Sequence, residues 1–230
     1  SAGGRIAQVR WEFAGQQPGP IERFLPTGLD GDTVVSLLSL PSQNIDALSL
    51  GLLSSDGRFK RLPLSEVVDL SGRATSVLKL KEGVELNSAV ICRDQGTLML
   101  MSDIGRLLRM QVTEDSLPLM GRLAQGPMTM RLLPGEQIVG AICTEKTPLM
   151  LFSQRGLVAR IDCSDLRYNQ RGDLGSMAVQ VDAESDRLVG ISAGTGLVGV
   201  RTSKDRHGRL DPEDINISNP GEKLMEQTSL

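Results

Sequence analysis

Arginine residues recur at a fixed distance after a glycine along most of the chain. Three segments of similar form, Leu48–Arg61, Leu98–Arg109 and Leu149–Arg160, each run from apolar residues through a serine and a glycine to a final arginine. That glycine lies four residues before the arginine, and successive glycines are 48 and 51 residues apart. A guanidinium at such a position either binds an anion at the surface or pairs with a carboxylate of the fold.

Acidic residues form a second series with the same period. Asp32, Glu85, Glu136 and Asp186 are 53, 51 and 50 residues apart, and each stands just before an apolar run. Two independent landmarks therefore indicate one repeat of about 50 residues. The recurrent arginines Arg61, Arg109 and Arg160 could pair with the acids Glu85, Glu136 and Asp186, and such pairs would tie neighbouring repeats together.

Each repeat predicts short strands separated by tight turns. Apolar runs of four to six residues end in Ser-Asp-Gly, Ser-Asp-Ile-Gly or Pro-Gly, which are strand and turn signals. We expect an all-β fold of about five four-stranded blades in a propeller-like, radial array, because one blade cannot bury both of its faces alone. The chain starts within a repeat at Gly4 and ends within one after Gly208, so we expect both termini to close the last blade.

Composition divides the chain into a body and a tail. The net charge of the 230 residues is −3, and the segment 210–230 carries five acidic residues against Lys223. We therefore expect a folded domain over residues 1–209 and a flexible acidic tail over 210–230. In the alternative hypothesis, the acidic tail occupies the basic surface of the body and so weakens the binding of another anion there.

Little in the sequence indicates catalysis or metal binding. Cys92, Cys143 and Cys163 lack metal-ligand spacing and His207 is the only histidine, so we expect reduced, buried thiols and no metal. The single tyrosine, Tyr168, is expected to serve in packing, and we find no catalytic residue. The absence of a long apolar run favours a cytoplasmic protein without membrane contact.

A third repeated feature, an Arg-x-x-x-Gly loop, completes the pattern. It occurs as Met120–Gly126 and Asn169–Gly175, and in a shorter form as Ser71–Ser76. In this order, the three features resemble the C-terminal β-pinwheel domain in the A subunit of bacterial type IIA DNA topoisomerases, which are DNA gyrase and topoisomerase IV. The resemblance covers about residues 4–209.

One segment departs from the gyrase pattern. The gyrase family has a Gln-Arg-Arg-Gly-Gly-Lys-Gly box that is associated with DNA wrapping, and the first repeat here, around Gly15–Pro20, is not basic. The nearest match to the box is a degenerate one, formed by Asn169, Gln170, Arg171, Gly172, Asp173, Leu174 and Gly175. The choice between gyrase, topoisomerase IV and a paralogue, and the occurrence of wrapping, therefore stay open.

The resemblance implies a monomeric, non-catalytic domain that binds double-stranded DNA through phosphates, without reading bases. Its partners would be the ATPase B subunit, together with the rest of the A subunit, and ATP and magnesium would bind elsewhere in the parent enzyme. The loop residues Arg73, Arg122 and Arg171 are the strongest candidates for phosphate contacts. Further candidates are Arg58, Lys60, Arg61, Arg106, Arg109, Arg155, Arg160, Arg201, Lys204, Arg206 and Arg209.

The rival hypothesis is a small β-propeller that acts as a protein-interaction scaffold and binds no DNA. Near-neutral charge favours it, but the Trp-Asp and kelch repeat signatures are missing. A carbohydrate-binding barrel is a weaker alternative, because aromatic residues make up only 3% of the chain. DNA binding that depends on salt would distinguish the first hypothesis from these two.

Overall fold

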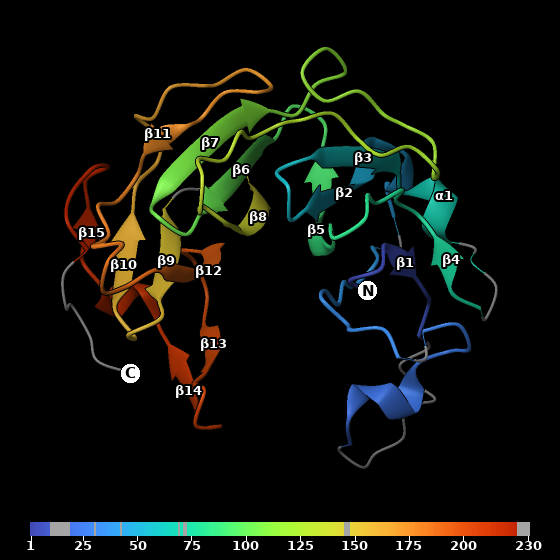
Figure 1. Cartoon of the computed structure of the whole chain (residues 1–230), viewed down its shortest axis with the longest axis horizontal. Coiled ribbons are helices and arrows are strands. Elements are labelled where there is room, and N and C mark those ends of the chain that lie inside the picture. The colour runs from blue at the N-terminus through green and yellow to red at the C-terminus, as the bar shows by residue number, and fades with distance from the viewer. Residues whose placement is uncertain are drawn as a thin grey trace. The chain divides into compact units, whose positions relative to one another are not determined.

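The computed structural model describes residues 1–9, 19–29, 31–41, 43–68, 70, 73–144 and 148–224 (Figure 1). Strands account for nearly all of its regular structure, so the expected all-β class is confirmed. Among the described residues, no helix is long and apolar enough to cross a membrane. Residues 15–18 of the first repeat, Ser71 and Gly72 of the first loop, and 225–230 of the predicted tail lie outside the described residues.

The first compact unit consists of residues 1–94 and 113–127. Its main sheet has the order β3-β2-β5, and a separate two-stranded ladder joins β1 to β4. Leucine side chains from β2, β3 and β5 form its core, together with Val67 and Val77. The elements are β1 (Arg5–Ile6), η2 (Ile21–Phe24), η3 (Ile45–Ala47), β2 (Leu48–Ser54), β3 (Phe59–Pro63), α1 (Ser65–Val68), β4 (Thr75–Ser76) and β5 (Leu86–Arg93).

The second compact unit consists of residues 95–112 and 128–230. It contains two four-stranded sheets, of order β11-β7-β6-β8 and β12-β9-β10-β15, and the β13–β14 hairpin. The elements are β6 (Thr97–Ser102), β7 (Arg106–Gln111), β8 (Ile138–Thr144), β9 (Leu149–Ser153), β10 (Val158–Ile161), β11 (Ser176–Met177), β12 (Leu188–Ala193), β13 (Val198–Arg201), β14 (His207–Leu210), η4 (Pro212–Asp214) and β15 (Ile217–Ser218).

One strand plan is common to the three larger sheets. A central hairpin, β2–β3, β6–β7 or β9–β10, is paired on one side with an inner strand from the following repeat, β5, β8 or β12. An outer segment from later in the chain lies along the other side. The predicted repeat of about 50 residues is thus one hairpin together with strands that pair with neighbouring hairpins. Each of the three larger sheets therefore contains residues from more than one repeat.

The hairpin turns follow from the Ser-x-x-Gly signal. Gly57, Gly105 and Gly156 all have positive φ, between 82° and 92°, which an L-residue with a side chain rarely adopts. In each turn the glycine N–H donates to the carbonyl of the serine three residues earlier, at 3.0 or 3.1 Å. The recurrence of glycine in the sequence therefore has a backbone cause.

The prediction of a flexible tail needs correction for residues 211–224. This segment is part of the fold, because β15 pairs in parallel with β10 and Leu224 belongs to the core that also contains Leu151 and Ile161. Ile215 is buried against Met150 and Val158. The apolar residues of this segment outweigh its acidic composition, so the boundary expected between residues 209 and 210 does not separate fold from tail.

The predicted joining of both termini in one blade stays a prediction. Among the described residues, β1 pairs with β4 alone, and β13 and β14 pair only with each other. Each of these ladders has fewer strands than the three larger sheets.

Candidate nucleic-acid interface

The recurrent arginines Arg61, Arg109 and Arg160 each link their hairpin to a segment outside it. Arg61 is 3.9 Å from Glu114 and 3.1 Å from Asp94. Arg160 is 2.5 Å from Glu213. The side chains of Arg61 and Arg160 are only 1% and 8% exposed, so these two guanidinium groups lie within the fold and do not form part of a binding surface.

Arg109 makes the same kind of link with uncharged partners. Its guanidinium donates to the carbonyl oxygens of Ser164 and Leu166, at 2.6 and 2.7 Å. It also lies 4.2 Å from the centre of the Tyr168 ring, within cation–π range. Tyr168 is 52% exposed, so it packs against one guanidinium at the surface and not in the core.

Two of the recurrent acids, Asp32 and Glu136, pair with arginines other than those that the sequence suggested. Arg106, directly after the turn glycine, donates to Glu136 with Nε at 2.9 Å and with Nη2 as well. Arg5 occupies the same place in the first unit and pairs with Asp32 at 2.9 Å. The predicted ion pair between Glu136 and Arg109 is therefore wrong, because Glu136 pairs with Arg106.

Both carboxyl groups remain ionised for the same reason. Burial would raise the pKa of Asp32, but hydrogen bonds from Ser1, Arg5 and the Gly3 N–H outweigh it and lower the pKa to about 2. Burial likewise opposes ionisation of Glu136, and hydrogen bonds from Arg106 and from the Leu133 N–H lower its pKa. These pairs stabilise the turns that carry them.

In the β9–β10 hairpin this pair is incomplete. Leu157 stands where the other turns have Arg5, Arg58 or Arg106, and the equivalent acid Asp186 is 7% exposed. Backbone N–H groups of Arg155 and Arg187 donate to its Oδ1, at 3.1 and 2.9 Å. Its Oδ2 has no hydrogen-bond partner among the described residues.

Replacing Leu157 by arginine should therefore raise the free energy of unfolding. A guanidinium there would supply the missing partner of Asp186, and a hydrogen bond to a charged group contributes about 1.5–3 kcal/mol before the lost packing of the leucine is subtracted. We expect a net gain of about 1 kcal/mol in urea unfolding. The same substitution made together with Asp186→Asn should give no gain, and an equal gain in that background would contradict the pairing.

The two complete Arg-x-x-x-Gly loops rise from the outer edges of two hairpins. The first begins where the Met120 N–H donates to the Arg61 carbonyl at 2.9 Å, and the second where the Asn169 N–H donates to the Arg109 carbonyl at 2.7 Å. They return where the Phe59 N–H donates to the Pro127 carbonyl at 3.2 Å and where β11 pairs with β7. Each loop is thus held at both ends.

Several of the predicted DNA-contacting bases hold these loops from within the protein. Arg58 donates to the Gly126 carbonyl at 3.0 Å, and Arg106 donates to the Leu174 carbonyl. Lys60, 1% exposed, donates from Nζ to the carbonyls of Arg122 and Val77, at 2.6 Å each. Arg106 is 6% exposed, so it and Lys60 position the loops without reaching the surface.

The lowered pKa of Lys60 makes the free energy of unfolding depend on pH. Burial lowers the pKa to about 8, with Glu66 acting in the opposite direction. Below pH 8 the amine is charged in the folded and unfolded states, so the burial penalty is fully present. As the pH rises from 8 to 10.5 only the folded state loses the proton, and the penalty is relieved.

We expect the wild type to gain about 3 kcal/mol relative to Lys60→Met over this pH range, with no relative change below pH 8. Urea unfolding of both proteins between pH 6 and 10.5 measures the difference. The neutral amine keeps two N–H groups for its two carbonyl partners, so the fold is retained. A constant difference across the whole range would show that Lys60 is not a buried cation.

Exposed basic residues lie on the loops themselves. Arg122 and Arg171 are exposed, and Arg122 has Glu66 at 3.4 Å. No side-chain hydrogen bond or ion pair of Arg171 occurs within the described part of the chain.

The degenerate box has a fixed shape, because Asp173 accepts from the Gln170 N–H at 3.1 Å and Asn169 accepts from the Arg109 N–H at 3.2 Å.

A second base accompanies each of these loops, and sequence reasoning missed both. The N–H of Lys79 donates to the Ala124 carbonyl at 3.3 Å, which places Lys79 beside the Arg122 loop. The N–H of Arg131 donates to the Asp173 carbonyl at 3.0 Å, and its side chain donates to the Gly172 carbonyl. Lys79 and Arg131 are exposed. Their separation of 52 residues, close to the repeat, is the signal that could have found them.

The equivalent position beside the β12-β9-β10-β15 sheet is not basic. The Gln180 N–H donates to the Glu222 carbonyl at 2.8 Å, and Gln180 also forms a bridge with Lys223. Here the pattern of two bases is replaced by an amide, an acid and one lysine. Paired bases therefore occur at two of the outer segments.

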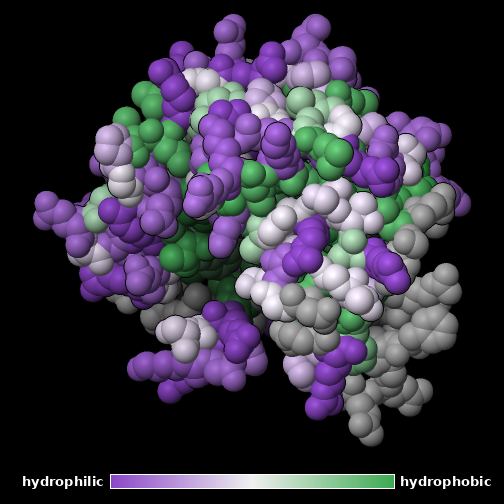
Figure 2. Space-filling model, turned by 45° about the vertical axis from the view of Figure 1, so that its right-hand side comes forward, coloured by the Kyte–Doolittle hydropathy of each residue, from purple (hydrophilic) through white to green (hydrophobic). Residues whose placement is uncertain are grey.

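The remaining candidate bases are exposed but less firmly placed. Arg73 forms a bridge with Thr27 at the edge of the first unit, and Arg155 lies in the turn between β9 and β10. Arg201 pairs with Asp205 at 2.7 Å. Exposed candidates near the β13–β14 hairpin are Lys204, Arg206 and Arg209. Hydrophilic side chains also cover much of the face in Figure 2, with smaller hydrophobic areas among them.

The strand plan defines a propeller-type fold in which hairpins exchange strands with neighbouring repeats. The family model described as "DNA gyrase C-terminal domain, beta-propeller" matches residues 52–93, 96–145 and 147–195. These three matches cover more than half of the chain. The chain therefore belongs to the DNA gyrase C-terminal domain family.

Known proteins agree with this assignment. The A subunit of DNA topoisomerase 4 from Synechocystis is 29% identical over 184 residues, and the A subunit of DNA gyrase from Mycolicibacterium smegmatis is 28% identical over 146 residues. These matches cover 74% and 63% of this chain, and the chain spans only 20% and 17% of the length of the two relatives.

Solved structures share the fold. The C-terminal domain of DNA gyrase A gives a TM-score of 0.71 at 19% identity, covering 87% of this chain and 72% of that one. The C-terminal domain of DNA topoisomerase IV gives a TM-score of 0.67 at 18% identity, covering 82% of this chain and 61% of that one. The family resemblance inferred from the repeats is thereby confirmed.

Proposed function

We propose that this domain binds duplex DNA non-specifically, through phosphate contacts from its two basic loops, as an accessory part of a type IIA topoisomerase A subunit. The observation that carries the proposal is the pair of exposed bases at each loop, Arg122 with Lys79 and Arg171 with Arg131. Anchored loops present these cations at little entropic cost on binding.

Phosphate binding fits these residues better than base reading. Among the described residues no α-helix is long enough to read bases from the major groove, since their one α-helix, α1, has four residues. Loop cations on a sheet edge instead neutralise phosphates and release counterions, which gives affinity without sequence preference. Membership of the gyrase C-terminal domain family supports the same ligand.

The wider role is proposed from the family. The domain would hold a DNA segment for the parent enzyme, whose catalytic tyrosine, ATP and magnesium sites lie on other domains or on the B subunit. It would act together with chromosomal DNA in the cytoplasm. DNA wrapping stays a prediction, because the box is degenerate and only two of the described loops carry paired bases.

Fluorescence anisotropy with labelled random duplexes of about 40 base pairs tests DNA binding by the wild type. We expect two unrelated sequences to bind with equal affinity, and the affinity to fall steeply between about 50 and 200 mM salt. Absence of binding at the lower salt concentration would overturn the proposal and favour a protein-interaction scaffold. A strong preference for one duplex would overturn the phosphate-only mode.

A further inference from the structure

An exposed apolar side chain recurs at the outer edge of the three larger sheets. Leu119, Tyr168 and Ile217 are spaced 49 residues apart and are 41%, 52% and 53% exposed. Leu119 forms a parallel bridge with Arg61, and Ile217 pairs in parallel with Arg160, so the position relative to the recurrent arginine is the same. Single exposed apolar residues are common on protein surfaces, but their recurrence at one structural position needs a cause.

Leu119 and Tyr168 also precede the two basic loops in the same way. The N–H of the residue after each of them donates to the carbonyl of the recurrent arginine, at 2.9 Å beside β3 and at 2.7 Å beside β7. The exposed base of each loop, Arg122 or Arg171, follows three residues after the apolar one. An apolar side chain and a cation therefore lie on the same short segment, whose start is fixed by a hydrogen bond.

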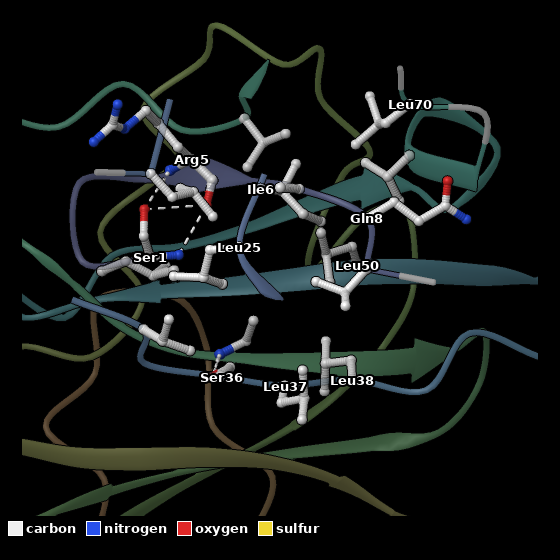
Figure 3. Close-up of a pocket in the computed structure, with 18 of the residues that line it drawn as sticks. Ser1, Arg5, Ile6, Gln8, Leu25, Ser36, Leu37, Leu38, Leu50 and Leu70 are labelled. Carbon is white, nitrogen blue, oxygen red and sulfur yellow. Dashed lines mark hydrogen bonds between the residues drawn. The ribbon is translucent and has the colours of Figure 1, made fainter. Parts of the chain in front are cut away.

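Core packing accounts for this spacing in the first unit only at Leu70. This residue, 49 positions before Leu119, packs against the apolar cluster that contains Leu50 and Val67, and it lies among the residues that line the cavity of that unit (Figure 3). Leu119, by contrast, has a large part of its surface in water. That exposed surface is available to a ligand.

Tyr168 is surrounded by cations. The Arg109 guanidinium lies 4.2 Å from the centre of its ring, and the exposed Arg167 and Arg171 are next to it and three residues after it. Its hydroxyl is 3.1 Å from Thr97 Oγ1, which holds the ring in place. A fixed, half-exposed ring among cations is complementary to a polyanion with apolar groups between its charges. The DNA backbone is such a polyanion, because a deoxyribose separates successive phosphates.

The acid beside Leu119 does not oppose the same ligand strongly. Glu114 accepts the Leu119 N–H at 3.1 and 3.2 Å, and its carboxylate is also 3.9 Å from Arg61 Nη2, which offsets its charge. The exposed bases Lys79 and Arg122 belong to the same loop region. Leu119 thus combines apolar surface with nearby positive charge, as Tyr168 does.

Ile217 has the apolar side chain without the cation. The residue three positions after it is Pro220, where the basic loops have Arg122 and Arg171. Its exposure is close to that of Tyr168. Ile217 is therefore a natural control for the effect of the apolar side chain alone.

We propose that Leu119 and Tyr168 pack against deoxyribose groups of the bound duplex, beside the phosphates that the loop arginines neutralise. This inference rests on the DNA-binding function proposed above and names its apolar contacts. Sugars and phosphates alternate along each strand, so one segment with an apolar side chain and a base meets both. Burial of the apolar surface adds affinity that is independent of salt, because it releases no counterions.

Fluorescence anisotropy with the duplex of about 40 base pairs, between about 50 and 200 mM salt, tests the contact on the full chain. We expect Leu119→Ser and Tyr168→Ser each to weaken binding about fivefold at every salt concentration, with the slope of log Kobs against log salt unchanged. Ile217→Ser, the matched control, should bind as tightly as the wild type. Tyr168→Phe keeps the ring and should retain wild-type affinity, and circular dichroism checks that each variant is folded.

The outcomes separate this contact from DNA binding itself. Wild-type affinity in both Leu119→Ser and Tyr168→Ser would overturn the sugar contact and leave the proposed function intact. A smaller slope in these variants would also overturn it, because the side chains would then act by placing the loop arginines. An equal loss in Ile217→Ser would show that the effect does not belong to the basic loops. Absence of DNA binding by the wild type would reject the proposed function and this contact together.

Discussion

Replacing Arg106 by leucine should lower the free energy of unfolding by about 3–5 kcal/mol, the range for removing one partner of a buried ion pair. The side chain of Glu136 is 1% exposed and would keep a charge without its main partner. The carbonyls of Leu174 and Arg131 would each lose a donor as well. Urea unfolding at neutral pH, monitored by circular dichroism, measures the change.

Arg171→Leu is the matched control for this substitution. It removes the same group from an exposed loop, and surface changes of that kind are usually within about 0.5 kcal/mol. Arg106→Leu combined with Glu136→Leu should recover much of the loss, because the uncompensated charge is gone. Equal stabilities of Arg106→Leu and Arg171→Leu would show that the buried pair does not stabilise the fold.

Gly105→Ala should be the most damaging single-methyl change. Gly105 has φ of +92°, and a Cβ there would lie 2.0 Å from the Val179 carbonyl oxygen. That oxygen belongs to the segment in which the Ala178 and Val179 N–H groups both donate to the Gly105 carbonyl. We expect a loss of about 3 kcal/mol or more, because backbone strain adds to steric overlap.

Gly135→Ala separates the two causes. Gly135 has φ of +79°, but nothing lies within 4 Å of the position that a Cβ would take there. The free energy of unfolding should therefore fall by the backbone strain alone, about 1 kcal/mol. If thermal unfolding shows that both variants have the same stability, this result contradicts a steric overlap between a Cβ at position 105 and the Val179 carbonyl oxygen.

The repeat was predictable from the sequence because its cause is local. Glycine at a positive-φ turn and short apolar strands are both properties of a few consecutive residues. The ion pairs were not predictable in the same way. Arg106 and Arg109 are three residues apart on one strand, so they point to opposite faces, and only the sheet shows which face meets Glu136.

The acidic end of the chain shows a different limit. Averaged composition predicted a flexible tail, whereas Ile215 and Leu224 are buried in cores formed by residues from much earlier in the chain, such as Met150 and Leu151. A few buried apolar side chains at suitable spacing keep this segment folded. The average composition of the whole segment does not reveal them. The basic pairs were missed for a related reason, because Lys79 lies beside a loop that belongs to a later repeat.

The salt dependence of DNA affinity in a loop variant tests phosphate binding. The variant Arg122→Ala with Arg171→Ala is compared with Arg23→Ala with Lys81→Ala, which removes the same charge from exposed positions outside the loops. We predict that the loop variant reduces the slope of log Kobs against log salt by about 1.8, or about 0.9 for each phosphate that is no longer neutralised, and that the control retains the wild-type slope. Equal slopes in all three proteins would contradict phosphate binding by these loops.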